Sequence, residues 1–260
     1  MGLWLKNLKQ KKNESVAVAT DLSKKETKWQ EREKELIHTA HELVDLHGFA
    51  NLTMDKLVDA SVFSKGTIYK HFSSKEDLLV ALGIHSISLN LELMNKALNY
   101  DGCSREKALA LHFAYQLFGR LEPALFSCVL STKSPAVVEK ASAERLALFF
   151  QKEQEIAQIC DTIFRQGIAD KSLALANSLS IEQVSFASWS FSFGTNLLLN
   201  NAGECHGVSR ISNHNVLLTN INLLFDGMNW QPLSTNFDYQ TTWRNLELYF
   251  SEYIELVSKG

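Results

Sequence analysis

The chain has 260 residues, of which 45% are hydrophobic, and its 26 Lys and Arg against 29 Asp and Glu give a net charge of −3. This length is enough for a sizeable core and for two domains. The small negative charge excludes a protein that coats nucleic acid without specificity, but not one that binds it through a locally basic surface. Residues 1–80 hold 13 basic against 12 acidic side chains, and residues 81–260 hold 13 against 17, so the N-terminal part is the less acidic.

The cysteines and the apolar stretches indicate the compartment. Cys103, Cys128, Cys160 and Cys205 show no paired spacing, so neither a zinc site nor a secreted disulfide framework is indicated. Reduced thiols fit a cytoplasmic protein. The N-terminal run MGLWL ends at Lys6 and is too short for a signal peptide. The apolar stretches fall short of the roughly 20 residues of a membrane span, and we expect a soluble, cytoplasmic protein without a membrane partner.

Helical periodicity runs through the chain. Apolar residues recur at intervals of three and four, no sustained alternating strand pattern stands out, and Gly and Pro number only 12 and 3. We therefore predict an all-α fold. Its expected divisions are a basic arm over 1–27, a three-helix domain over 28–80, and a larger helical domain over 81–260 that includes an added helix over 241–258.

The arm over 1–27 is polar and rich in lysine, so we expect a solvated and poorly ordered tail. Two alternatives stay open, a basic arm that reaches a DNA backbone or minor groove and an amphipathic anchor formed by the first residues. The first firm helix is predicted over 28–47 and ends where Gly48 suits a C′ position. His38 and His41 on this helix lack a third ligand nearby, so we expect surface or packing histidines and no metal site.

The stretch from Thr53 to Leu79 has the pattern of two short helices joined by a tight turn. Thr53 suits the N-cap of the first helix and Ser64 that of the second. Ile68 and Phe72 fall on the inner face of the second helix. The residues around them are small, hydroxylic, aromatic or basic and are expected to point outward: Lys65, Gly66, Thr67, Tyr69 and Lys70. This pattern predicts a helix-turn-helix whose second helix enters the DNA major groove.

Further helices follow in order along the chain. A long helix is predicted over 75–100, with Glu76 and Asp77 in its first turn, where the helix dipole favours anions. The next helix is expected over 104–132, with Ser104 as its cap and a short successor that begins at Pro123. A longer helix should run from Pro135 to about Gln166 and end at Gly167. Three more are expected over 180–199, where Ser180 and Gln183 form a capping box, over 213–226 and over 241–258. The helix over 180–199 is apolar nearly all round, so we expect it to be buried on several sides.

One ordered pattern runs through the first three predicted helices and into the start of the fourth. It reads Ile37-x-x-Ala40-x-x-Leu43, then Gly48-Phe49, then Thr53-Met54-x-x-Leu57, then Ser64-Lys65-Gly66-Thr67-Ile68-Tyr69-x-x-Phe72, then Ser74-Lys75-x-x-Leu78-Leu79. This pattern, over about residues 30–82, resembles the DNA-binding domain of TetR/AcrR-family transcriptional regulators. Val62 departs from it, because the family's turn usually carries glycine there. We expect the turn in this chain to avoid positive φ.

Side-chain chemistry and this resemblance point to one set of DNA contacts. Gly66 would let the helix approach the bases closely, and Thr67 offers a methyl group to thymine and a hydroxyl to a base edge or phosphate. The resemblance assigns phosphate contacts to Thr53, Tyr69 and Lys75, two of which stand at helix N-termini. The full predicted set is Thr53, Ser64, Lys65, Gly66, Thr67, Tyr69, Lys70, His71 and Lys75.

The resemblance implies a homodimeric, ligand-responsive, sequence-specific DNA-binding transcriptional regulator, which we expect to be a repressor. The helices over 180–199 and 213–226 would pair with their copies in a second subunit, and the helix over 75–100 would transmit the ligand state. A small apolar or aromatic effector would bind among residues 104–200 and release the double-stranded DNA operator. The candidate ligand-binding residues are Phe113, Tyr115, Phe126, Phe164, Trp189 and Phe193.

Two other classes of function stay open from the residues alone, a helical enzyme and a helical protein-interaction module with a vestigial DNA-binding motif. The chain has no HExxH, no glycine-rich phosphate loop and no nucleophile elbow, so neither a catalytic residue nor a cofactor is predicted. His112 with Cys128 or Cys160 could suggest a thiol dyad, but the sequence does not place these residues together. We expect a protein that is not an enzyme.

Overall fold

A computed structural model describes residues 24–127, 129–176, 178–211 and 215–258. Within these ranges the chain is helical and contains no strand, which confirms the predicted all-α fold. Residues 1–23, most of the predicted basic arm, lie outside the described ranges. The first described helix begins at Lys24, four residues before the predicted start at residue 28.

The chain divides into two compact units. The first contains the described residues up to Ile87, Ala124–Phe150 and the C-terminal end, and the second contains Ser88–Pro123 and Gln151–Glu255. The first unit is therefore larger than the domain expected over 28–80, because it takes in the segment 124–150. Two helices, α5 (Lys75–Leu98) and α9 (Ala143–Ala169), begin in the first unit and end in the second.

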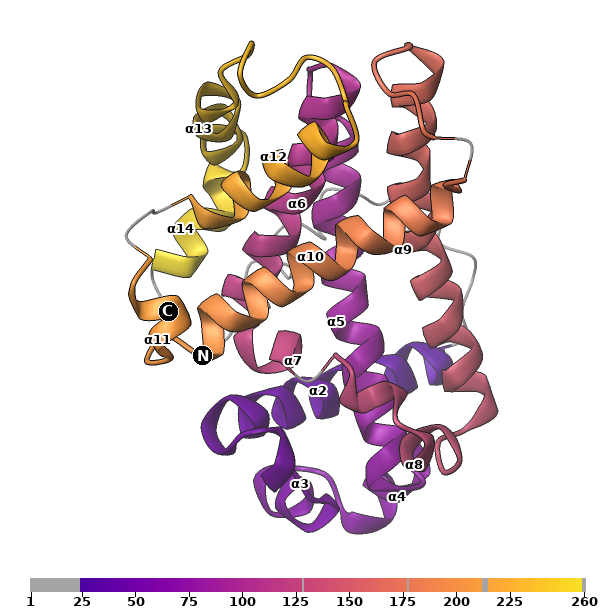
Figure 1. Cartoon of the computed structure of the whole chain (residues 1–260). Helices are drawn as coiled ribbons and strands as arrows, with labels where there is room; N and C mark the ends of the chain where they lie inside the picture. The colour runs from indigo at the N-terminus through magenta and orange to yellow at the C-terminus, as the bar shows by residue number, and fades with distance from the viewer. Residues whose placement is uncertain (1–23, 128, 177, 212–214, 259–260) are drawn as a thin grey trace. The chain divides into compact units, whose positions relative to one another are not determined.

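The first unit combines the 24-residue helix α2 with several short helices (Figure 1). They are α2 (Lys24–His47), the 3-10 turn η1 (Phe49–Asn51), α3 (Met54–Ala60), α4 (Lys65–His71), α7 (Pro123–Ser127), the 3-10 turn η2 (Ser131–Lys133) and α8 (Pro135–Val138), together with the first turns of α5 and α9. Leu36, Leu57 and Phe72 are fully buried between them. Helices too short to be stable alone are thus held by a shared apolar core.

Local capping forms the helix-turn-helix as predicted. The side-chain oxygens of Thr53 and Ser64 each accept a hydrogen bond from the backbone N–H three residues later, at 3.2 and 3.3 Å. Each bond satisfies an N–H that has no partner within its helix. Gly48, after α2, has a φ of 78°, which few other residues adopt. Val62 has no positive φ, as expected, and its side chain is exposed.

Helix α6 (Ser104–Leu121) is central to the second unit. Packed against it are α10 (Ile181–Asn201), α12 (Val216–Gly227) and α13 (Tyr239–Tyr249), and the short helices α11 (His206–Ser209) and α14 (Ser251–Ser258) belong to the same C-terminal region. The Phe113 ring of α6 lies 5.0 Å from that of Trp243 and 5.5 Å from that of Phe250, between ring centroids. The added C-terminal segment therefore packs on α6. It forms two helices and not one, because the buried Phe250 has a backbone conformation outside the helical range.

The start and end of α6 differ from the prediction. Cys103, and not Ser104, stands at the N-cap position. The Glu106 carboxylate accepts a hydrogen bond from the Cys103 backbone N–H at 3.0 Å, so an acid completes the capping box. The helix ends at Leu121 and not at 132, because Pro123 begins the separate helix α7, as the sequence indicates.

The helix predicted over 135–166 is divided into two. Helix α8 covers only Pro135–Val138, and α9 begins at Ala143. The break is stabilised by Asp77 of α5, whose Oδ1 accepts hydrogen bonds from the backbone N of Ser142 at 3.0 Å and from its Oγ at 2.8 Å. A partner distant in sequence therefore decides where α9 starts.

Gly167 lies inside the last turn of α9 and does not end the helix as predicted. A Cβ at this position would lie 2.7 Å from Cζ2 of Trp230, so any larger residue would collide with the indole ring. The helix continues to Ala169, and the chain leaves it through Lys171, which has a φ of 65°. Close packing, and not helix termination, explains the glycine.

A buried arginine joins α6 to the end of α12. Arg105 is fully buried, and its Nη2 donates to Asp226 Oδ1 at 2.7 Å and to Asn222 Oδ1 at 3.1 Å. Its Nη1 donates to the backbone carbonyls of Trp230 and Pro232. A charge is tolerated in a core only when it is paired and hydrogen-bonded in this way. This arrangement attaches the chain after α12 to the centre of the unit.

Helix α5 is the one described helix that is long and apolar enough to cross a membrane. Of its most apolar stretch, 78% is buried inside the protein. A helix buried to this extent is typical of a protein core, and a core helix can match a membrane span in length and composition.

Candidate nucleic-acid interface and helical-domain cavity

The surface formed by α3, the turn and α4 carries the predicted DNA contacts. Ile68 and Phe72 are fully buried, so the opposite face of α4 points outward. The predicted residues that are exposed are Thr53, Ser64, Lys65, Gly66, Tyr69 and Lys70, and those that are half-buried are Thr67 and Lys75. We call this set of eight residues the α4 surface.

Lys65 on the α4 surface already has an acidic neighbour. Its Nζ lies 3.1 Å from Asp55 Oδ1 and 5.7 Å from the centre of the Tyr69 ring. The hydrogen bond with Asp55, reinforced by the Asp55 charge, raises the pKa of Lys65. Exposed ion pairs of this kind contribute little to stability. Lys65 therefore stays charged and can exchange the carboxylate for a phosphate at small cost.

Gly66 lies at a place where the fold itself has room for a side chain. A Cβ built on Gly66 meets no atom within 4 Å, and φ there is not positive. Glycine in a helix is less favourable than alanine by about 1 kcal/mol. Neither backbone strain nor close packing within the chain explains why this residue is glycine. The absence of a side chain here would, however, let another molecule approach the helix closely.

His71 is placed differently from the prediction that it donates to DNA phosphate. Its residue is only 4% exposed, and its ring stacks on Trp29 with centroids 3.8 Å apart. Its Nδ1 lies 3.3 Å from Glu33 Oε2. His71 follows Ile68 by three residues and therefore shares the inner face of α4. We exclude it from the α4 surface.

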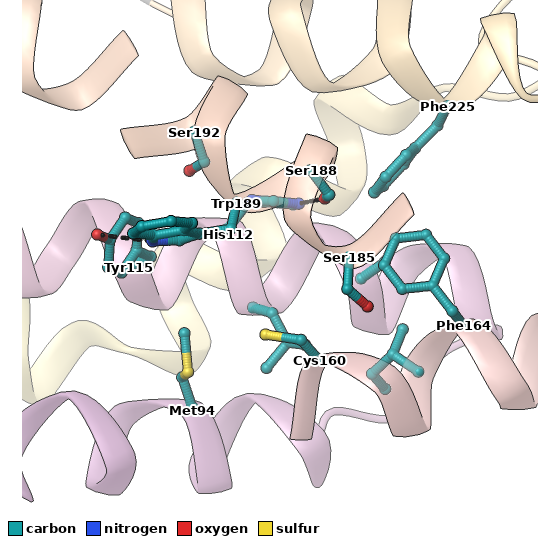
Figure 2. Close-up of a pocket in the computed structure, with 13 residues that line it drawn as sticks. Met94, His112, Tyr115, Cys160, Phe164, Ser185, Ser188, Trp189, Ser192 and Phe225 are labelled. Atoms are coloured by element: carbon teal, nitrogen blue, oxygen red, sulfur yellow. Dashed lines mark hydrogen bonds between the residues drawn. The ribbon is translucent and has the colours of Figure 1, made fainter. Parts of the chain in front are cut away.

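The second unit contains a cavity of about 30 Å³, which is room for about one water molecule. Its lining comes from α5, α6, α9, α10 and α12, and comprises Met94, Ala108, Leu111, His112, Tyr115, Cys160, Ile163, Phe164, Ser185, Ser188, Trp189, Ser192 and Phe225. Figure 2 shows aromatic rings and small polar groups facing the same space. The cavity is apolar in its walls and carries a short row of hydroxyl groups.

The polar groups of the cavity are neutral and paired. His112 Nε2 lies 2.8 Å from Ser188 Oγ, and burial lowers the pKa of His112 to about 3. Trp189 Nε1 donates to Tyr115 Oη at 3.2 Å, and burial raises the pKa of the Tyr115 phenol (Figure 2). Desolvation raises the pKa of the Cys160 thiol to about 12. At neutral pH none of the three titratable side chains, His112, Tyr115 and Cys160, is charged.

The predicted ligand-binding residues divide between this cavity and other parts of the core. Tyr115, Phe164 and Trp189 line the cavity. The other three do not line it, since Phe113 packs towards α13, Phe193 packs on the Trp189 ring and Phe126 is buried in the first unit.

Sequence reasoning missed the hydroxyl row of the cavity. Ser185, Ser188 and Ser192 are spaced by three and four residues, so they fall on one face of α10. That face points into the cavity, and His112 meets its middle member. Serines at this spacing in an otherwise apolar helix are the signal that could have found them.

Helix α10 is not buried on several sides within the single chain, contrary to the prediction. Phe186, Phe191 and Leu198 are 64%, 43% and 52% exposed. Leu223 on the adjoining α12 is 65% exposed. A helix that is apolar nearly all round is usually buried on all sides. In α10 the serine row occupies the face turned towards the core, so these large apolar side chains lie on the exposed face. The result is an apolar surface on α10 and α12.

No group of three or more His, Cys, Asp or Glu side chains suited to a metal occurs among the described residues. His38 Nε2 lies 3.5 Å from Glu42, and the His41 Nε2 lies 3.9 Å from Asp45, each one turn along α2. Both histidines are thus next to carboxylates of their own helix.

The N-terminal helices match the model of a known protein family. Residues 36–82 match the family model described as bacterial regulatory proteins, tetR family. The match covers most of α2, all of α3 and α4 and the start of α5, and it confirms the resemblance seen in the sequence pattern. Among the curated proteins, none matches the chain.

Solved structures share the fold at low sequence identity. A protein with unknown function from Rhodococcus sp. RHA1 aligns with a TM-score of 0.61 and 16% identity, over 76% of this chain and 95% of that one. A tetR-family regulatory protein from Rhodococcus RHA1 aligns with a TM-score of 0.57 and 15% identity, over 76% and 97%. The regulator FadR from Bacillus subtilis, solved with stearoyl-CoA, aligns with a TM-score of 0.56 and 16% identity, over 75% and 98%.

His112 should make the stability of the protein depend on pH. The unfolded chain protonates this residue below pH 6.5, whereas the folded chain keeps it neutral down to about pH 3. The free energy of unfolding should therefore fall with decreasing pH in that window, by about 1.4 kcal/mol per pH unit for this group. Urea unfolding of wild type and His112→Gln at pH of about 7.5 and about 5 measures it, and the drop should be about 2 kcal/mol smaller in the variant. Equal drops would contradict the assignment.

Proposed function

We propose that this chain, whose residues 36–82 match the model of the tetR family of bacterial regulatory proteins, is a member of that family and a homodimeric repressor whose operator binding is controlled by a small apolar or aromatic effector. The observation that carries the proposal is the α4 surface. It combines a helix-turn-helix with exposed Lys65, Tyr69 and Lys70 around a glycine that the fold does not need.

The α4 surface would bind DNA through a few placed contacts. Gly66 allows the first turn of α4 to approach base edges, and Thr67 offers a methyl and a hydroxyl group there. Thr53, Tyr69 and Lys75 would hold phosphates on either side and set the register of the helix in the major groove. Because the first 80 residues are nearly neutral, bulk attraction is weak, and specific contacts and dimerisation have to supply the affinity.

The apolar surface on α10 and α12 supports a dimer. The exposed Phe186, Leu198 and Leu223 would be removed from water by a second copy of the same two helices, in a four-helix interface with two-fold symmetry. A two-fold dimer presents two α4 helices to half-sites about 34 Å apart or a multiple of that distance.

The cavity of the second unit is the proposed effector site. At about 30 Å³ it is too small for any effector as it stands, so a ligand would bind a conformation in which the walls move apart. Such a ligand controls DNA binding only if it prefers the conformation with low operator affinity. Aromatic walls and a neutral hydroxyl row fit an apolar or aromatic compound with one polar, uncharged group facing Ser188.

The chemistry of the cavity does not favour the alternative of an enzyme. A histidine with a pKa of about 3 is a weak base at neutral pH, although it lies within hydrogen-bond distance of Ser188. A thiol with a pKa of about 12 is a weak nucleophile because so little of it is ionised. Neither group is activated for covalent catalysis.

Substitutions on the α4 surface test DNA binding. Tyr69→Ala and Lys70→Ala should each weaken protection of the DNA upstream of the protein's own gene about tenfold, and Lys70→Ala should also reduce the salt slope of binding by about 1. Gly66→Ala should weaken binding without lowering the thermal midpoint, since its Cβ meets nothing in the chain. Arg244→Ala, an exposed cation on α13, is the control. If all four variants protect the DNA equally well, the proposal that α4 binds the operator is contradicted.

Charged substitutions test the dimer. Leu223→Glu places a carboxylate in the proposed interface and should convert a dimer into a monomer in sedimentation at micromolar concentration. Leu248→Glu, on α13, is a matched control because this leucine is 74% exposed and lies on another helix, so the dimer should persist. A dimeric Leu223→Glu variant, or a monomeric wild type, would contradict the interface.

A ligand screen tests the effector site. Small uncharged compounds with aromatic rings or acyl chains are assayed for a rise in the thermal midpoint and for release of DNA. A true effector should do both, with a stabilisation of about 2.7 kcal/mol at a hundredfold excess over its dissociation constant. Ser192→Phe should fill the cavity and abolish both effects. A screen in which no compound alters DNA affinity would count against effector control.

A further inference from the structure

Arg145 lies where four helices of the first unit meet. It belongs to the first turn of α9, and its side chain is only 16% exposed. Its Nη1 lies 2.7 Å from Glu33 Oε1 of α2, and its Nε lies 3.4 Å from Asp77 Oδ2 of α5. Its Nη2 donates to the backbone carbonyl of His71, the last residue of α4, at 2.7 Å. One guanidinium thus connects α9 to α2, α4 and α5.

His71 is held from both its backbone and its side chain. While its carbonyl accepts from Arg145, its ring lies between the indole of Trp29 and the second oxygen of Glu33, at 3.8 Å between ring centroids and 3.3 Å between Nδ1 and Oε2. The Arg145 guanidinium also lies 4.9 Å from the centre of the Phe72 ring. Glu33 therefore bridges the arginine and the histidine.

Asp77 fixes the other side of the guanidinium. Burial alone would raise the pKa of Asp77, but the hydrogen bonds from Ser142 and Ser73 and the charge of Arg145 outweigh burial and hold this pKa below its ordinary value. The carboxylate therefore stays ionised at neutral pH. It orients Arg145 and, through Ser142, the start of α9.

Helix α4 needs support at its C-terminal end. It has seven residues, too few to be stable in isolation, and its N-terminal end is capped by Ser64. The last carbonyls of a helix lack intrahelical partners and carry partial negative charge, which a cation satisfies. Arg145 supplies that cation, and its fork of donors reaches three acceptors in fixed directions as a lysine could not.

We propose that Arg145 is a positioning residue for DNA binding, which holds α4 at the angle at which its outer face meets the operator. This inference rests on the proposed function, because it concerns how the α4 surface is aimed. Arg145 lies on the same continuous helix as Cys160, Ile163 and Phe164, which line the cavity of the second unit. A change in α9 that withdraws Arg145 would release α4 and lower DNA affinity.

The test uses the full-length chain and two readouts. Arg145→Met keeps an unbranched stem but removes the guanidinium with its charge and donors. It should lower operator affinity at least tenfold at a temperature where circular dichroism shows the variant fully folded. Hydrogen exchange of the amides over 68–72 should become at least tenfold faster, with no change in α12. Arg145→Lys should restore only part of the operator affinity and only part of the slow exchange over 68–72, because one ammonium cannot satisfy three partners in fixed directions.

Two control variants separate positioning from general stability. Lys140→Met removes an exposed ion pair with Glu76 close to the start of α9, and should leave both readouts at wild-type values. Leu125→Ala weakens the core of the first unit at a side chain that is not a partner of Arg145, and should lower the thermal midpoint without changing the DNA affinity of the folded protein.

Three outcomes decide the matter. Wild-type affinity and exchange in Arg145→Met would overturn the proposal. Loss of affinity in Leu125→Ala equal to that in Arg145→Met would reduce Arg145 to a stabilising residue and would also overturn it. If the wild type protects no DNA, the proposed function fails, and exchange over 68–72 alone decides whether Arg145 holds α4.

Discussion

The anchoring of one short helix is the constraint on which the α4 surface, the proposed DNA-binding surface, depends. Helix α4 has seven residues and cannot hold its own shape or direction. Ile68, His71 and Phe72 bury its inner face, and the Ser64 cap and the Arg145 guanidinium complete its two ends. Because the inner face is taken, Lys65, Gly66 and Tyr69 have to point outward. The chemistry of the surface follows from the burial behind it.

The same logic governs the charges of the protein. The α4 surface is lightly charged, and Lys65 is shared with Asp55 until another anion replaces it. Behind it, Arg145 is paired with both Glu33 and Asp77. The second unit places Arg105 against Asp226 in its core and keeps its cavity neutral. Paired charges hold the helices in position, and the regions proposed to bind a partner are left weakly charged or uncharged.

The sequence predicted the local elements well where neighbours in the chain decide them. The Thr53 and Ser64 caps, the Ser180 and Gln183 capping box and the Pro123 start are all present, because each depends on residues within four positions. The predicted start and the predicted end of α9 were both wrong. Asp77, far away in sequence, sets the break before α9, and Trp230 explains a glycine that was interpreted as a helix end.

The sequence by itself determined the helical class, the helix-turn-helix and the outward residues of α4, because helical periodicity and capping are local properties. Only the tertiary structure decided which polar residues are internal. It buried His71, which looked like a DNA contact, placed Arg105 and Arg145 in networks with distant carboxylates, and set His112 opposite the serine row of α10. It also left Phe186 and Leu223 exposed. Each of these outcomes depends on partners many residues apart, and spacing along one helix cannot specify what packs against its faces.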